Sequence, residues 1–114
     1  MRAHNDMATA RVSQEERFRV AAEVLGMLAD PTRLALLRLL AAGEQDVNTL
    51  AGQVSASRSS VSQHLGRLRL AGLVHVRREG RRMVYRVVSG HLSGLVDEAL
   101  EFADHAVRGI PHHE

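Results

Sequence analysis

The sequence predicts a mainly α-helical domain with one β-hairpin, in the order of four helices, the hairpin and a last helix. Apolar residues recur at helical spacing through most of the 114-residue chain. Between Leu73 and Val88 the spacing changes to the alternation typical of strands. The segment "REGR" at residues 78–81 lies where the hairpin should turn, and Gly80 can supply a positive φ there.

The first helix is expected over residues 13–28. Ser13 and Glu16 form a capping-box pattern immediately before an apolar helical period. Residues 1–12 show no such period, so we expect them to form a flexible N-terminal arm.

Three more helices are expected before the hairpin. Asp30 can cap the second helix with Pro31 at its first position, and Gly43 ends it. Asp46 can cap a short third helix, and a serine-rich turn then leads into a fourth helix that Gly72 ends. Two helices joined by a tight turn therefore precede the hairpin directly.

The helical period returns from His91 to about Ala106, so the domain is expected to span residues 13–106 and to leave a C-terminal tail at 107–114. A chain of this length buries only about two thirds of its unfolded surface, which makes it marginal alone. We therefore expect a homodimer.

Several classes of protein are excluded by composition. No run of about 18 apolar residues and no basic start followed by an apolar segment occurs, so we expect a cytoplasmic protein with no membrane contact. Cysteine is absent, so any metal ligands must be nitrogen or oxygen atoms. The chain has no HExxH helix, no nucleophile paired with a base and no glycine-rich phosphate loop, so we do not expect an enzyme.

Charge is distributed unevenly along the chain. All 15 basic residues are arginine, and eight of them lie between Arg58 and Arg86, where Glu79 is the only acid. The segment after residue 96 has five acids and one arginine. The middle of the chain is therefore a candidate polyanion-binding surface, and the C-terminal part is a candidate cation-binding one.

The fourth helix has two different faces. At about 100° per residue, Leu65 and Leu68 share one side, while Gln63 and Arg67 point to the other. Glutamine can bond adenine and arginine can bond guanine or phosphate, so the polar side fits a DNA major groove. Each feature alone is common on protein surfaces, but a polar helix face followed by an arginine-tipped hairpin favours DNA binding. The candidate DNA-binding residues are Ser57, Arg58, Ser59, Ser60, Ser62, Gln63, Arg67, Arg77, Arg78, Arg81 and Arg82.

The segments "LADPTRLALLRLL" and "VNTLAGQVSASRSSVSQHLGRLRLAGLVHVRREGRRMVYRV", with the helix that follows, resemble the ArsR/SmtB family of winged-helix transcriptional regulators. The resemblance implies a winged helix-turn-helix fold and a homodimer formed by the first and last helices. It also implies double-stranded DNA as the partner, with two recognition helices on an inverted-repeat operator whose half-sites lie about one helical turn or a multiple apart.

The last helix departs from the pattern of the zinc-sensing branch of this family. Ser89 and Phe102 stand where that branch has two of its four ligands, while His91 and His105 remain. These histidines are about 21 Å apart along one helix but within about 40° of the same face. If the last helices of two subunits pack antiparallel, His91 comes close to His105 of the partner subunit.

The sequence of a histidine, an acid–histidine pair and then "GIPHH" resembles the nickel- and cobalt-sensing branch of the family. That resemblance implies a repressor released from its operator by Ni(II) or Co(II). Nitrogen and oxygen ligands approaching six favour these octahedral ions over Zn(II), which remains the alternative. The implied metal ligands are His91, Asp104, His105, His112, His113 and Glu114.

Other readings remain open. A regulator of the same fold could respond to zinc or to no metal, with its C-terminal histidines idle. An activator, or a regulator that needs a partner protein, would have the same sequence features. His4 is one residue late for an amino-terminal chelate and is not expected to be a ligand. We expect His64 to make a structural hydrogen bond and His75 to lie on the surface.

Overall fold

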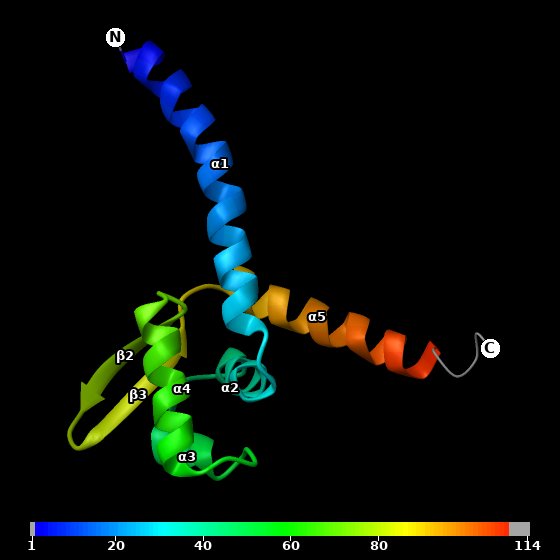
Figure 1. Ribbon diagram of the computed structural model, residues 1–114. Helices are drawn as coiled ribbons and strands as arrows, with labels where there is room; N and C mark the ends of the chain where they lie inside the picture. Colours follow the sequence, from blue (N-terminus) through cyan, green and yellow to red (C-terminus); the bar gives the residue numbers. More distant parts are fainter. Residues whose placement is uncertain (1, 110–114) are drawn as a thin grey trace.

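The computed structural model describes the backbone of residues 2–109 and the side chains of residues 13–109. It confirms a mainly helical chain with a β-hairpin wing (Figure 1). The elements in chain order are α1 (Arg2–Leu28), α2 (Pro31–Ala41), β1 (Gln45–Asp46), α3 (Val47–Ala51), α4 (Arg58–Leu70), β2 (Val74–Glu79), β3 (Arg82–Val87) and α5 (Gly90–Gly109).

One hydrophobic core joins the helices to the wing. Helix α2 is central and contacts α1, α4, α5 and β3. The largest fully buried side chains are Leu36, Leu37, Leu50, Val61, Leu65, Leu68, Val74 and Val96. Because α2, α3, α4, β2 and α5 all contribute to this core, the helix-turn-helix and the wing are held as one unit.

Local capping signals set the starts of the middle helices. Asp30 accepts a hydrogen bond from the backbone N–H of Arg33 at 2.9 Å, and Pro31 is the first residue of α2, as predicted. Asp46 caps α3 through the backbone N–H of Thr49 at 2.8 Å, also as predicted. Each carboxylate satisfies a backbone donor that the first turn of its helix leaves unpaired.

The hairpin turns where the sequence indicates, but the sheet contains a third strand. Glu79 pairs with Arg82 and Gly80 has φ 65°, the positive value that this tight turn requires. Strand β1, which the sequence analysis missed, pairs antiparallel with β3 and gives the order β1-β3-β2. A strand of 2 residues is too short to show alternation, so the pattern of apolar residues could not reveal it.

Helix α1 begins at Arg2, so the prediction that it starts at residue 13 was wrong. Ser13 lies inside the helix, and the expected arm at residues 1–12 is helical from residue 2. This segment contains alanine, arginine and methionine but neither proline nor glycine, so nothing in it stops a helix even though it lacks an apolar period.

Helix α5 also runs further than predicted, to Gly109 instead of about residue 106. Val107 and Arg108 are compatible with a helix, so it continues to the glycine. The expected tail at 107–114 is therefore helical for its first residues, and residues 110–114 lie outside the described part of the chain.

Helices α1 and α5 project from the core in different directions (Figure 1). The radius of gyration is 17.6 Å, against about 13 Å for a compact chain of this length. Phe18 on α1 is 72% exposed and Phe102 on α5 is 75% exposed. Both projecting helices therefore have apolar residues that this single chain does not cover. Among the described residues, no helix is long and apolar enough to cross a bilayer.

Candidate nucleic-acid interface

Helix α4 presents the two faces that the sequence predicts. Val61, Leu65 and Leu68 are fully buried against the core. On the opposite side, Gln63 and Arg67 are exposed, and so are Ser59 and Ser62. Helix α4 also stands beside the β2–β3 hairpin (Figure 1). The result is a short polar surface next to an arginine-rich wing.

The residues at the start of α4 also have structural roles. The hydroxyl of Ser57 accepts a hydrogen bond from the backbone N–H of Ser60 at 3.0 Å, so Ser57 is the N-cap of α4. Arg58 donates from Nε to the side-chain oxygen of Asn48 on α3. This contact joins the two helices of the helix-turn-helix, and the sequence analysis did not assign Asn48 any role.

His64 connects α4 to the start of α2. Its Nδ1 lies 3.9 Å from Oδ2 of Asp30 and 3.5 Å from Nη1 of Arg33. Arg33 in turn donates from Nε to the carbonyl oxygen of Met27 at 2.6 Å. The pKa of Asp30 is lowered, mainly by the hydrogen bond from the backbone N–H of Arg33. The expected structural role of His64 fits this cluster, which links the polar helix to the α1–α2 junction.

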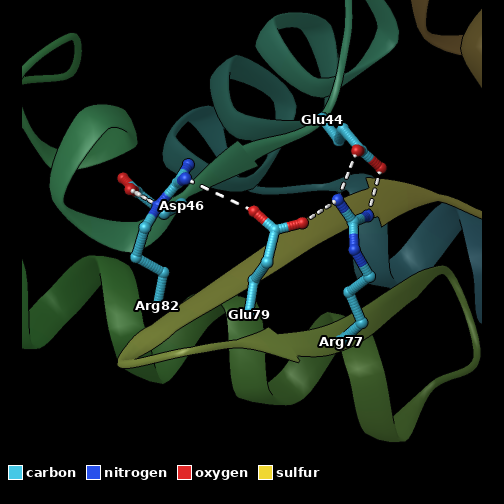
Figure 2. Close-up of polar contacts among 5 residues, drawn as sticks. All are labelled: Glu44, Asp46, Arg77, Glu79 and Arg82. Atoms are coloured by element: carbon cyan, nitrogen blue, oxygen red, sulfur yellow. Dashed lines mark hydrogen bonds and ion pairs between the residues drawn. The ribbon is translucent and has the colours of Figure 1, made fainter.

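A network of ion pairs holds the wing against β1 (Figure 2). Arg77 donates to both carboxylate oxygens of Glu44, at 2.6 and 2.7 Å, and to Glu79 at 2.8 Å. Arg82 donates from Nε to Asp46 at 2.8 Å and lies 3.4 Å from Glu79. We call these five residues the wing network. It joins β2 and β3 to the segment that leads into α3.

The ionisation of the wing network reflects these bonds. The pKa of Asp46 is lowered to about 2, first by hydrogen bonds from the hydroxyl and the backbone N–H of Thr49 and then by Arg82. The pKa of Glu44 is lowered mainly by its hydrogen bond from Arg77. The pKa of Arg77 is raised by Glu44 and, after it, by Glu79. Asp46, Glu44 and Arg77 are therefore charged at neutral pH.

The four arginines predicted to act together in the wing fall into two pairs. Arg77 and Arg82 belong to the wing network. Arg78 donates from Nε to the carbonyl oxygen of Gly80 at 3.2 Å, and Arg81 lies in the turn. Over residues 13–109, no carboxylate pairs with Arg78 or Arg81. Sequence reasoning missed this division because Glu44 and Arg77 are 33 positions apart and no local pattern joins them.

The predicted metal ligands on α5 are exposed. His91 and His105 lie at opposite ends of the helix, and Asp104 pairs with Arg108 at 3.2 Å. Within the described residues, no three His, Cys, Asp or Glu side chains come close enough together to hold a metal ion. His112, His113 and Glu114 lie outside the described residues. Within residues 13–109, a single chain therefore does not bring the predicted ligands His91, Asp104 and His105 together into one metal site.

Comparisons with known proteins agree with a helix-turn-helix packed beside a β-hairpin wing. Residues 30–76, which include the helix-turn-helix, match the family described as "Bacterial regulatory protein, arsR family". The HTH-type transcriptional regulator KmtR of Mycobacterium tuberculosis is 46% identical over 99 residues, covering 87% of this chain and 76% of that protein. The regulator NmtR of the same organism is 38% identical over 89 residues, covering 78% of this chain and 74% of that protein.

Solved structures show the same fold. The transcriptional repressor BigR from Xylella fastidiosa aligns with a TM-score of 0.72 at 33% identity, covering 81% of this chain and 94% of that chain. A homodimeric winged helix-turn-helix DNA-binding domain from Mycobacterium bovis, Mb0332, aligns with a TM-score of 0.71 at 33% identity, covering 81% of this chain and 85% of that chain. The relatives are transcriptional regulators, which confirms that this is not an enzyme family. The chain belongs to the ArsR/SmtB family of winged-helix, DNA-binding transcriptional regulators.

Proposed function

We propose that this regulator is a homodimeric repressor that Ni(II) or Co(II) releases from an inverted-repeat operator. The main supporting observation is that His91 and His105 are exposed on α5 beside a row of apolar residues that the single chain leaves uncovered. We call this row the seam; it consists of Leu95, Ala99, Phe102 and Ala106. The C-terminal pattern resembles the nickel- and cobalt-sensing branch, and Zn(II) is the alternative ion.

The seam on α5 fits a helix of a second subunit. Leu95, Ala99, Phe102 and Ala106 recur at alternating spacings of four and three residues, and all are exposed. This is the spacing by which two helices interlock in a coiled coil. Phe18 and Leu25 on α1 are also exposed and can extend the same interface. The M. bovis relative is a homodimer, which supports this assembly.

The candidate ligands follow one edge of that seam. His91, Glu98 and His105 follow one another at intervals of seven residues, so they share a position relative to the apolar residues. An antiparallel pair of α5 helices centred on Glu98 places His91 opposite His105 of the partner subunit. The same symmetry repeats the pair at the other end, giving two sites per dimer.

The side chains are suited to the proposed ions. Imidazole nitrogen and carboxylate oxygen are ligands that Ni(II), Co(II) and Zn(II) all accept. Asp104 lies about 100° around the helix from His105, so it reaches the site from the side. To bind the ion, its carboxylate must break its ion pair with Arg108. We assign the remaining ligands to His112, His113 and Glu114.

Metal binding between subunits can control DNA binding by coupling. The ion favours whichever dimer arrangement brings His91 and His105 of the partner subunit together. If that arrangement places the two α4 helices at a spacing that does not match the half-sites, DNA affinity falls by the same coupling free energy. The chain itself supplies the ligands, the interface and the recognition helices.

A titration of the DNA complex with metal tests the proposal. The operator is first selected from a randomised duplex library with apo protein, and the complex is then titrated with Ni(II), Co(II) and Zn(II). We expect Ni(II) or Co(II) to release the wild-type protein and to leave a His91→Ala variant bound. Release by Zn(II) alone, stronger binding with metal, or equal behaviour of the two proteins would contradict it.

A further inference from the structure

We propose that the wing binds DNA phosphates through Arg78 and Arg81 only, while Arg77 and Arg82 position the wing through Glu44, Asp46 and Glu79. This assignment deepens the DNA-binding function and is independent of the metal response. It replaces the expectation that all four arginines of the wing contact DNA.

The guanidinium groups of Arg77 and Arg82 are already bound to carboxylates. Arg77 makes two parallel hydrogen bonds to Glu44 and a third to Glu79. The paired geometry with Glu44 is the same fork that arginine uses to bind a phosphate. A phosphate would have to displace these carboxylates and leave their negative charges beside the DNA backbone.

The net charge of the wing network points the same way. Three carboxylates face two guanidinium groups, so the five residues together have a net charge of −1. Such a cluster does not attract a polyanion. The attraction of the wing tip for DNA must therefore come from arginines outside the network, and Arg78 and Arg81 are the two nearest the turn.

Strand register places these two groups of arginines on different parts of the wing. Arg77 pairs with Val84, and Glu79 pairs with Arg82, so their side chains lie on one face of the hairpin. Arg78 is on the other face, the one whose Val74 and Tyr85 enter the core beneath α4. Arg81 lies in the turn itself. Arg78 and Arg81 are thus at the wing tip, with Arg78 on the face that packs beside the recognition helix.

The wing network is also placed to set the orientation of the wing. One oxygen of Asp46 binds the backbone N–H of Thr49 and caps α3, while the other binds Arg82 on β3. The first helix of the helix-turn-helix and the wing therefore share one carboxylate. Loss of Arg77 or Arg82 should change the orientation of the wing relative to the helix-turn-helix without changing the number of phosphates that the wing contacts.

The dependence of DNA affinity on salt separates these two roles. Wild-type protein and single alanine variants of the four arginines are titrated onto a short duplex of mixed sequence over a range of salt concentrations. The slope of log K against log salt is negative, and each lost phosphate contact decreases its magnitude by about 0.9, or about 1.8 for the two wings of a dimer. We expect this decrease for Arg78→Ala and Arg81→Ala and an unchanged slope for Arg77→Ala and Arg82→Ala, whose affinity can still fall.

Two further variants keep the test decisive. Arg17→Ala removes a charge from α1 and should leave the slope unchanged, which separates a local contact from net charge. Arg77→Lys keeps the charge and replaces Arg77→Ala if that variant does not fold. A decrease of slope for Arg77 or Arg82 variants equal to that for Arg81→Ala, or no decrease for Arg78→Ala and Arg81→Ala, overturns the assignment. Absence of any salt-dependent binding by wild-type protein would instead overturn the DNA-binding function itself.

Discussion

Asp46 accepts a hydrogen bond from Nε of Arg82 at 2.8 Å while its other oxygen caps α3, so one carboxylate joins the wing to the helix-turn-helix. Residues 36 positions apart in the sequence meet in this contact. The position of the wing relative to the recognition unit therefore depends on an ionised side chain.

Acid should weaken this connection. The pKa of Asp46 is about 2 in the folded chain, against 3.8 ordinarily, so its contribution to stability is fully present above about pH 4. That contribution is lost as pH falls from about 4 toward 2, because the unfolded state takes up the proton more readily. We expect Asp46→Asn to be less stable than wild type at neutral pH and to lose less stability over this acid range. Thermal unfolding as a function of pH measures the difference, and parallel curves for the two proteins would contradict it.

The serines at the start of α4 should separate into a structural and a DNA-binding group. Ser57 caps the helix, so Ser57→Ala should cost about 1 kcal/mol of unfolding free energy and lower Tm by about 4 to 8 °C. Ser59 is exposed on the polar face, so Ser59→Ala should leave Tm nearly unchanged and weaken DNA binding. Calorimetry and DNA titration of both variants test this pair. Equal loss of Tm in the two variants would contradict this division between a structural serine and a DNA-binding serine.

Gln63 should contribute to sequence preference. It is exposed on the face of α4 opposite Val61, where a side chain can reach base edges. Gln63→Ala should lose about 1 to 3 kcal/mol of discrimination at one base pair in each half-site, with no change in the salt slope. Selection from a randomised duplex library shows the preferred bases. An identical preference in the variant would remove Gln63 from the set of base-reading residues.

The uncovered face of α5 should be a dimer interface. Phe102→Asp places a charge in the apolar seam and should shift the protein toward monomer in sedimentation experiments. Leu70 offers a matched control, because it is 88% exposed on α4 and outside the seam. Leu70→Asp should therefore remain a dimer. Dimers of equal stability in both variants would mean that Phe102 is not at the interface.

The parts of the fold that the sequence predicted correctly depend on local signals. Asp30 with Pro31 begins α2, and Gly80 turns the hairpin, because caps and turns involve neighbouring residues. The wrong start of α1 came from the same kind of signal, since a capping pattern at Ser13 is also compatible with the interior of a helix.

Long-range features could not be predicted in this way. Strand β1 exists because Gln45 meets Tyr85 in the folded sheet, and Glu44 binds Arg77 only after that sheet has formed. The candidate metal ligands are a further case, because their proposed partners lie on a second subunit. The sequence therefore indicated which residue types form the DNA-binding surface, but not that two of the wing arginines pair with carboxylates while the other two do not.

Mixing two inactive variants tests the central claim, that the metal site is shared between subunits. His91→Ala and His105→Ala are refolded separately and together, and tight Co(II) binding is measured by visible absorption. If His91 binds with His105 of the partner subunit, neither variant alone forms the site. About half of the dimers in the mixture are then mixed and each holds one intact pair, so about a quarter of the wild-type sites should return. A mixture that binds no more Co(II) than the separate variants would contradict a site shared between subunits.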